Sequence, residues 1–403
     1  MGKKQNKALP LVAGAVIQLC IGIIYIWSIF QPSVMEYYSW SAADASVTFS
    51  IMLATFVLGI VLGGRINDKK GPRPVVFLGG ILFCAGIFLS SLVPQDMPQL
   101  IWLFYGGIAG FGVGAAYTST ISCAQKWFMD KKGFATGVIV CTFGASTVVF
   151  TPVANTLLKS VGVSQTFLTL SLIFLAVILI FGWFVKNPSK EYMDRFETRL
   201  PDLSAQKQYT PGEVLKTKYY YFIFLSMLLL TPAYFIINPL LKSLGELRSL
   251  TEAAALAGVM ATGMASAAGR LLAPWLSDRL GRRNVLFLLY GITLVSILLL
   301  TFAQSYFFIV LIALVSFAFG GSAGVYPAVT ADYFGIKNNG VNYGLVMIAF
   351  AVSGLLFPAI AKVVTPGGIP TAWTFLVPAI AAVAGILITV ALKKDKAKKE
   401  SIS

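Results

Sequence analysis

The stretch ASAAGRLLAPWLSDRLGRR, residues 265–283, joins an apolar segment rich in small residues to a short charged loop. One cation, Arg270, stands inside the apolar segment, and the next charged residue along the chain is Asp278. At about 1.5 Å of helical rise per residue, Arg270 lies roughly 12 Å from that loop. In a hydrocarbon core ~30 Å thick, this depth is close to the middle of the membrane.

The composition indicates that the segment does lie in a membrane. Hydrophobic residues make up 57% of the 403 residues and charged residues only 12%, with a mean hydropathy of +0.80. Soluble domains are about one-quarter charged. The apolar runs are continuous and approach the ~20 residues that a membrane-spanning helix needs, which excludes a β-barrel with its shorter alternating segments. We therefore expect an all-α membrane protein.

Twelve membrane-spanning helices in two six-helix bundles are expected from the apolar runs. The first run is long, has no clear small-residue cleavage site and leads into another span, so it does not resemble a cleaved signal peptide. The expected ranges are 9–30, 45–64, 74–93, 98–122, 133–158, 164–185, 219–241, 251–276, 284–302, 305–328, 341–362 and 371–392.

The charges are distributed unevenly between the two ends of these spans. A net charge of +15 and a pI near 9.6 would also suit a nucleic-acid-binding protein. With the N-terminus inside, however, almost all lysines and arginines fall on the inner side, as the positive-inside rule requires. The exceptions are Lys159, Lys242, Arg248 and Lys362 outside and Arg270 within a span. We therefore expect a multi-pass protein of the cytoplasmic (inner) membrane, with both termini cytoplasmic and no nucleic acid as partner.

The sequence lacks the residues that several kinds of chemistry require. There is no histidine, and the four cysteines, all in or beside spans, are most simply small apolar side chains: Cys20, Cys84, Cys123 and Cys141. No phosphate-binding loop, acid–base pair or nucleophile–base set occurs in the spans. We expect no metal, no cofactor and no enzymatic activity.

The chain repeats itself. "GGRINDKKGPRP" (63–74) and "APWLSDRLGRRN" (273–284) each follow the second span of a half, and "WFMDKKGFATG" (127–137) and "YFGIKNNGVNYG" (333–344) each follow the fourth. Two pairs at nearly one offset predict duplicated halves. We expect an N-terminal bundle over 1–185, a polar cytoplasmic linker over 186–218, and a C-terminal bundle with a basic tail over 219–403, in a monomer.

These repeated loops resemble the loop signature of the major facilitator superfamily. The run Asp278-Arg279-Leu280-Gly281-Arg282-Arg283 carries the resemblance, and a looser copy contains Gly64, Asp68, Lys69, Gly71 and Arg73. An aspartate in such a loop can face a helix end, and the glycine permits a tight turn. The resemblance implies a gating role for Asp68, Arg73, Asp278, Arg279, Arg282 and Arg283.

Within that superfamily the chain is similar to the oxalate/formate-antiporter-like branch, which is akin to the monocarboxylate porters. The similarity rests on "WFMDKKGFATGV", "GIIYIWSIF", "YTPGEVLKTKYYYFIF" and "NYGLVMIAF". The sequence departs from the porters in lacking a lysine inside the first span, and Ser266 stands where they carry an aspartate one turn before the arginine.

Three interpretations of Arg270 are open. An arginine at this depth costs at least ~2.5 kcal/mol unless its environment compensates it. It can extend toward the interface, brace neighbouring helices, or face a central cavity and bind an anion. The family resemblance favours the last, because members use the matching arginine to hold a carboxylate. A guanidinium presents parallel donors to both carboxylate oxygens and keeps its charge.

Other candidate site residues come from the facing spans. Tyr25 and Tyr117 match aromatic site positions of the family, and Tyr326 lies at a depth similar to that of Arg270. Each is as readily explained by packing or by an interfacial position. Ser28 is a weaker candidate. Oxalate/formate exchangers place a second cation at the position of Phe350, so a dianion would leave one carboxylate unpaired here.

The sequence therefore predicts a secondary active transporter of small monocarboxylates such as lactate, pyruvate or formate. It would work by alternating access, either proton-linked or by exchange. One alternative is a dicarboxylate–monocarboxylate antiporter of the oxalate/formate type. An alternative from another class is a membrane anion sensor that does not transport, which would need a folded partner-docking domain.

Overall fold

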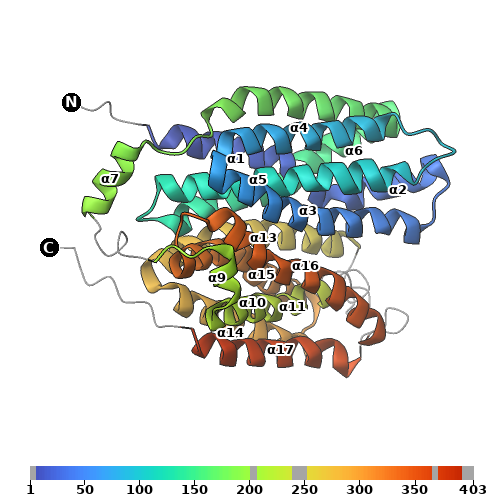
Figure 1. The fold of residues 1–403 in the computed structure, drawn as a ribbon. Coiled ribbons are helices and arrows are strands. Elements are labelled where there is room, and N and C mark those ends of the chain that lie inside the picture. Colours follow the sequence, from blue (N-terminus) through green and yellow to red (C-terminus); the bar gives the residue numbers. More distant parts are fainter. Residues whose placement is uncertain (1–5, 200–206, 238–251, 365–370, 393–403) are drawn as a thin grey trace.

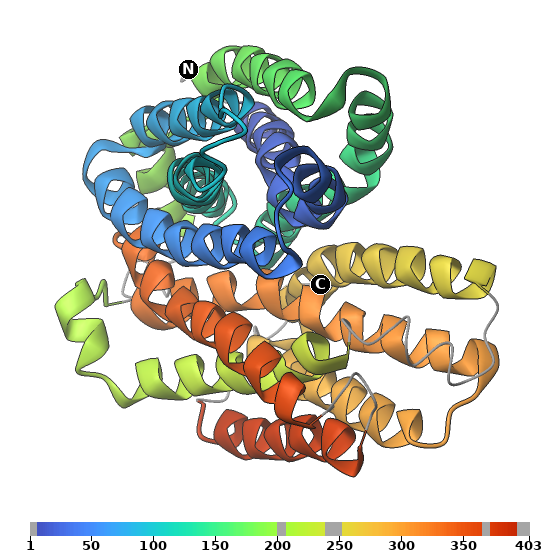
Figure 2. The ribbon, with the colours of Figure 1, turned by 90° about the vertical axis from the view of Figure 1, so that its right-hand side faces the viewer.

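The computed structural model describes residues 6–199, 207–237, 252–364 and 371–392, and these form helices with no β-strand. Lys242, Arg248 and the basic tail lie outside the described residues. Figure 1 shows two groups of roughly parallel helices, blue to green for the first half of the chain and yellow-green to red for the second. Seen from the end opposite the two termini, the groups remain separate and pack along one face (Figure 2).

The N-terminal half begins with a bent span, in which a short 3₁₀ segment separates two α-helices. A π-helical segment also precedes one of its later helices. The elements in order are α1 (Ala8–Ile21), η1 (Gly22–Ile26), α2 (Trp27–Tyr38), α3 (Ala42–Lys70), α4 (Pro72–Ser91), η2 (Trp102–Ala109), α5 (Gly110–Trp127), α6 (Lys132–Phe181) and η3 (Gly182–Phe184).

The C-terminal half repeats the pattern of long helices joined by short turns. Its first span is again divided, here by Pro232, which removes a backbone donor and disrupts the helix. The elements are α10 (Lys218–Leu230), α11 (Pro232–Ile237), α13 (Glu252–Leu280), α14 (Arg282–Leu300), α15 (Ser305–Phe334), α16 (Asn339–Val364) and α17 (Ala372–Val390).

Fewer helices than the twelve expected spans are individually long and apolar enough to cross a membrane in the described part of the chain. In the described part, eight helices are long and apolar enough to cross a membrane, or nine if α1 and α2 form one bent span. The twelve expected segments are nevertheless recognisable. α6 contains two of them, which reverse at Gly162, where φ is 76° and ψ is −178°. Two further expected spans do not count among the long apolar helices. One is formed by η2 together with α5, and the other is α13.

The predicted linker is not wholly irregular. It contains α7 (Lys190–Arg199) and α9 (Pro211–Leu215), and both lie at the end of the molecule that carries the termini (Figure 1). A capping box begins α9, in which Thr210 and Glu213 exchange side-chain and backbone hydrogen bonds, and this bonding lowers the pKa of Glu213. The Tyr209 amide also donates to the Phe334 carbonyl at 2.9 Å, so this part of the linker docks on the C-terminal half.

The two halves meet along helices that cross closely at small residues. α6 packs against α13, and α3 packs against α16. A Cβ added at Gly137 of α6 would lie 2.9 Å from the Leu271 carbonyl oxygen, and one added at Gly344 of α16 would lie 2.9 Å from the Val61 Cα. Small residues therefore let these backbones approach, as is usual between membrane helices. These two crossings position the candidate site.

Candidate functional site

Two aspartates from the repeated loops bind helix N-termini in the opposite half. Asp278, near the end of α13, accepts hydrogen bonds from the amides of Gly133 and Phe134 at 2.9 and 2.8 Å, at the start of α6. The partially positive N-terminus of a helix favours such a carboxylate. We call this contact the Asp278 clasp.

The first half makes the matching contact. Asp68, near the end of α3, accepts hydrogen bonds from the Gly340 and Val341 amides at 3.2 and 3.0 Å, at the start of α16. This is the Asp68 clasp. Asn67 donates to Asp68 at 3.2 Å. The sequence repeat thus becomes a reciprocal contact, in which each half caps a helix of the other at the same end of the molecule.

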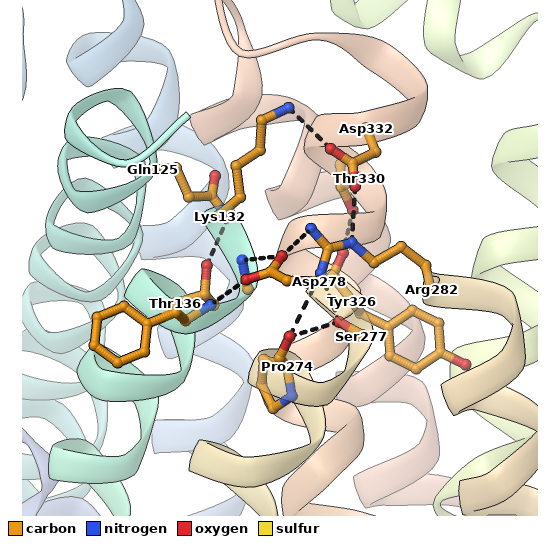
Figure 3. Close-up of polar contacts among 12 residues, drawn as sticks. Gln125, Lys132, Thr136, Pro274, Ser277, Asp278, Arg282, Tyr326, Thr330 and Asp332 are labelled. Atoms are coloured by element: carbon orange, nitrogen blue, oxygen red, sulfur yellow. Dashed lines mark hydrogen bonds and ion pairs between the residues drawn. The ribbon is translucent and has the colours of Figure 1, made fainter. Parts of the chain in front are cut away.

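A chain of ion pairs extends the Asp278 clasp (Figure 3). Arg282 pairs with Asp278 at 2.6 Å and with Asp332 of α15 at 2.8 Å, and it also donates to Ser277. Lys132 of α6 pairs with Asp332 at 2.8 Å, so this last pair joins the two halves. Arg282 and Lys132 are buried. The network therefore holds the two halves together at this end.

Lys132 and Asp332 were not expected from the sequence, although a signal exists. The repeat aligns "AQKWF" (124–128) with "TADYF" (330–334), so Lys126 occupies the position of Asp332 with the opposite charge. A charge reversal between otherwise matching repeats marks a position where the two halves make different contacts. This comparison would have singled out Asp332.

Three of the six expected gating residues lie outside both the clasps and this ion-pair network. Arg73 donates to the Trp183 carbonyl at 2.7 Å. Arg279 lies 4.2 Å from the centroid of the Trp275 ring, and Arg283 lies 5.3 Å from that of Phe287. These contacts join each cation to an aromatic residue or carbonyl of its own half. Of the predicted set, Asp68, Asp278 and Arg282 are the residues that meet at the junction of the halves.

Arg270 lies about two turns from the Asp278 clasp along α13, and it is buried, with 4% of its surface exposed. Its side chain reaches the N-terminal half. A Cβ added at Gly144 of α6 would lie 3.0 Å from the Arg270 Cδ, 3.1 Å from Nε and 3.3 Å from Cζ. The Cys141 thiol, one turn earlier on α6, is within electrostatic range of the same guanidinium. The predicted cation therefore lies at the contact between the halves.

The structure brings Tyr117 to the same part of α6. Its ring is buried, with its centroid 4.9 Å from that of Phe143 and 5.3 Å from that of Phe56. Phe143 directly precedes Gly144, on which Arg270 packs. Two expected site residues, one from each half, thus approach one short segment of α6.

Tyr326 lies elsewhere, contrary to its expected place beside Arg270. Its side chain is fully buried, and its hydroxyl lies 2.8 Å from the Ser226 hydroxyl in a cluster with Tyr290 and Thr389 inside the C-terminal half. Figure 3 shows its ring directed away from Thr136 of α6. The spacing predicted its depth but not the side of α15 that it occupies. Tyr326 therefore belongs to the core of the C-terminal half.

Phe350 packs in an aromatic cluster of the C-terminal half. Its ring centroid lies 5.9 Å from that of Phe235 and 6.0 Å from that of Phe319, and 6% of its surface is exposed. The cluster is continued by Tyr234, whose ring stacks on Phe319 at 3.7 Å. Oxalate/formate exchangers carry a second cation at this position. Here the position is apolar, and aromatic rings surround it.

Ser28 lines a cavity of about 660 Å³ at the end of the molecule opposite the clasps. Gln31, Glu36 and Trp40 also line it, all on or just beyond α2. The side chain of Tyr25 lies outside the described part of the chain. The structure thus places Ser28 in this cavity, whose lining includes neither Arg270 nor Tyr117.

A helical membrane protein whose duplicated halves meet around a buried cation, with one end closed by reciprocal contacts, has the construction of a secondary transporter. The chain belongs to the Major Facilitator Superfamily, whose family model matches residues 12–274 and 223–403. The predicted fold class and family are thereby confirmed.

Relatives of the predicted branch are also found. The oxalate:formate antiporter of Oxalobacter formigenes is 27% identical over 379 residues, covering 91% of this chain and 87% of that protein. Monocarboxylate transporter 13 of Rattus norvegicus is 30% identical over 142 residues, covering 35% of this chain and 33% of that protein. The chain is therefore a secondary transporter, and it is similar to members of the predicted branch.

A solved structure supports the fold. FucP, a Major Facilitator Superfamily transporter in the outward conformation, superposes with a TM-score of 0.73 at 14% identity, covering 97% of this chain and all of FucP's solved chain. At that identity the similarity shows a shared architecture of helices.

Proposed function

We propose that this transporter carries small monocarboxylates, such as lactate, pyruvate or formate, and that Arg270 binds the carboxylate. The observation that carries the proposal is the position of Arg270, which is buried deep in a span and packs across the junction of the halves on Gly144. A transport site must lie at such a junction, because both halves have to contact the substrate as they move.

The chemistry of the guanidinium suits a carboxylate. Its planar fork gives two parallel hydrogen bonds to the two oxygens, and its charge does not depend on pH. A bound anion adds a negative charge beside a cation that is otherwise expensive to place near the middle of a membrane. Tyr117 and Phe143 would supply an apolar wall beside the bound anion.

The preference for a monoanion follows from Phe350. An apolar aromatic cluster surrounds this position, so no cation stands there to pair a second carboxylate. Burying an unpaired carboxylate is costly. The oxalate/formate type of antiport remains the second candidate, because the Oxalobacter formigenes antiporter is similar over 91% of this chain.

The clasps and the cavity fit alternating access. The Asp68 and Asp278 clasps close one end, and the cavity beside Ser28 lies at the other. Release at the clasped end requires both clasps and the Lys132–Asp332 pair to break. We place this end in the cytoplasm of the inner membrane, because the predicted inner loops are basic and the linker helices lie there, and we take the carrier to be a monomer.

Uptake into proteoliposomes tests the proposal. Radiolabelled lactate, pyruvate, formate and oxalate are supplied with and without an inward proton gradient, and with and without unlabelled substrate inside. We expect saturable uptake of at least one monocarboxylate, with oxalate a poor substrate. Uptake of oxalate better than any monocarboxylate would establish the antiporter alternative. Uptake of none of the four acids would disprove carboxylate transport.

A further inference from the structure

Three glycines of α6 face α13, and one of them differs from the other two. A Cβ added at Gly137 would have three backbone atoms of α13 as its nearest neighbours, with the carbonyl oxygens of Leu271 and Arg270 at 2.9 and 3.2 Å. One added at Gly133 would meet the Pro274 carbonyl oxygen and, at 2.6 and 2.7 Å, the side chains of Arg282 and Asp278. At Gly144 the three nearest atoms all belong to the Arg270 side chain. Gly137 thus lets two backbones approach, and Gly133 accommodates both the α13 backbone and the Asp278–Arg282 pair, whereas the nearest atoms at Gly144 are those of one functional side chain.

The contact at Gly144 covers the part of Arg270 that fixes its orientation. The Cδ, Nε and Cζ atoms lie 3.0, 3.1 and 3.3 Å from the position that a Cβ would take. Cδ, Nε and Cζ are consecutive atoms, and Nε and Cζ belong to the guanidinium plane. The end of the side chain therefore lies along α6 over a residue that has no side chain of its own.

The distances from the Gly144 Cβ position to the Arg270 atoms determine how far a methyl group there would displace the guanidinium. Distances of 3.0–3.3 Å are shorter than ordinary contacts between carbon atoms, which lie near 3.5–4.0 Å. A methyl group at residue 144 would therefore push the guanidinium away by several tenths of an ångström. The Arg270 side chain can rotate to accept this change, whereas a helix backbone could not. Such a shift would tilt the fork that a carboxylate must match in two places.

We propose that Gly144 is a positioning residue for substrate recognition, because its missing side chain seats the Arg270 guanidinium against the opposite half. This inference rests on the proposed function of Arg270 and extends it to α6. The seat has a consequence for recognition. A substrate held by Arg270 would then lie against α6 of the other half, where Phe143 precedes Gly144 and packs on Tyr117, so both halves would contact it.

Gly144→Ala tests the seat, and Gly137→Ala is its matched control. Residues 137 and 144 are about two turns apart, so they lie on one face of α6 and face the same helix. We expect Gly144→Ala to raise the KM for lactate and formate roughly 10-fold with little change in maximal rate, since small misplacements of a binding group are costly. Gly137→Ala presses on the α13 backbone at Leu271 and Arg270, so it should mainly lower the thermal stability and the maximal rate, and raise KM by much less than Gly144→Ala does.

Each outcome decides the question. An unchanged KM in correctly inserted Gly144→Ala protein would overturn the seat, and so would an equal rise in KM for both variants. A Gly144→Ala protein that fails to fold would also overturn it, because its methyl group would then be meeting more than a movable side chain. Arg270→Gln, measured in parallel, separates the two proposals. Uptake that survives Arg270→Gln disproves the proposed site, whereas lost uptake with a normal Gly144→Ala protein disproves only the seat.

Discussion

At the scale of single residues, the candidate site depends on geometry more than on charge. Arg270 carries the same formal charge as a lysine would, but only a guanidinium offers two coplanar donors. Gly144, on which it packs, and the Tyr117 ring, which packs on the preceding Phe143, both belong to the opposite half. Anion binding by Arg270 therefore depends on the shape of the guanidinium and on how the two halves dock.

Arg270→Lys should lose most lactate or formate transport although the charge remains. Losing one charge-assisted hydrogen bond to the carboxylate is worth roughly 10- to 100-fold in affinity. The measurement is the initial rate of uptake into proteoliposomes with equal amounts of inserted protein, and Arg270→Ala is the reference for complete loss. Near-normal uptake by Arg270→Ala would show that this residue does not bind the substrate.

Phe350→Lys should improve competition by oxalate against labelled lactate by roughly 10-fold, because a second fixed cation can pair the second carboxylate. The ratio of inhibition constants for oxalate and unlabelled lactate is the quantity to measure. Phe350→Leu, which stays apolar, is the control and should leave the ratio unchanged. If the lysine variant folds and its ratio equals that of the leucine variant, Phe350 does not face the substrate.

At the scale of helices, contacts between the halves decide which end is closed. Lys132, at the start of α6, pairs with Asp332 at the end of α15, and its neighbour Lys131 is exposed. Removing the Lys132 charge leaves Asp332 paired with Arg282, so the halves remain folded. What weakens is the contact that crosses between them.

Lys132→Met should therefore shift the carrier toward the state that is open at the clasped end. A loss of about 1 kcal/mol corresponds to a roughly fivefold change in population. A membrane-impermeant thiol reagent, applied from the clasped side in inside-out vesicles, should then modify Cys141 faster. Cys141 is the partly exposed cysteine of the four, and Cys20, Cys84 and Cys123 are buried. Lys131→Met is the control, and equal rates in both variants would contradict a locking role for the pair.

Sequence patterns predicted some parts of the site and not others, for a physical reason. Hydropathy and the repeat give the depth of a residue along its helix, so Arg270, Asp68 and Asp278 could be selected in advance. Depth says nothing about rotation about the helix axis, and Tyr326 proved to face the core of its own half. Gly144 and Lys132 act only through the other half, so their roles required the docked structure.

At the scale of the whole molecule, the substrate is expected to affect the movement itself. The predicted spans contain no Asp, Glu or His near the depth of Arg270. Proton coupling through a carboxylate buried there is therefore not expected. A bound carboxylate neutralises the charge of Arg270. The loaded site therefore crosses the low-dielectric region at a lower electrostatic cost than the empty site.

Exchange should consequently be faster than net flux. Proteoliposomes preloaded with unlabelled lactate or formate should take up external label faster than empty ones at the same pH. Liposomes without protein, with and without internal substrate, give the background. Equal rates for loaded and empty vesicles would mean that the substrate-free carrier returns freely, and would contradict this account of the site.

The two clasps are chemically unequal. Each aspartate accepts from two backbone amides. In the described part of the chain, Asp278 also pairs with Arg282, which it shares with Asp332 and through it with Lys132, whereas Asp68 has a further hydrogen bond from Asn67. Because the Asp68 clasp is weaker than the Asp278 clasp, we do not expect the two clasps to break at the same time. We expect the two halves to separate first between α3 and α16, at the Asp68 clasp. They would then rotate about the contact between α6 and α13, where the Asp278 clasp still holds. The first gap would then appear on the side away from Arg270, and the substrate would still be gripped when water enters.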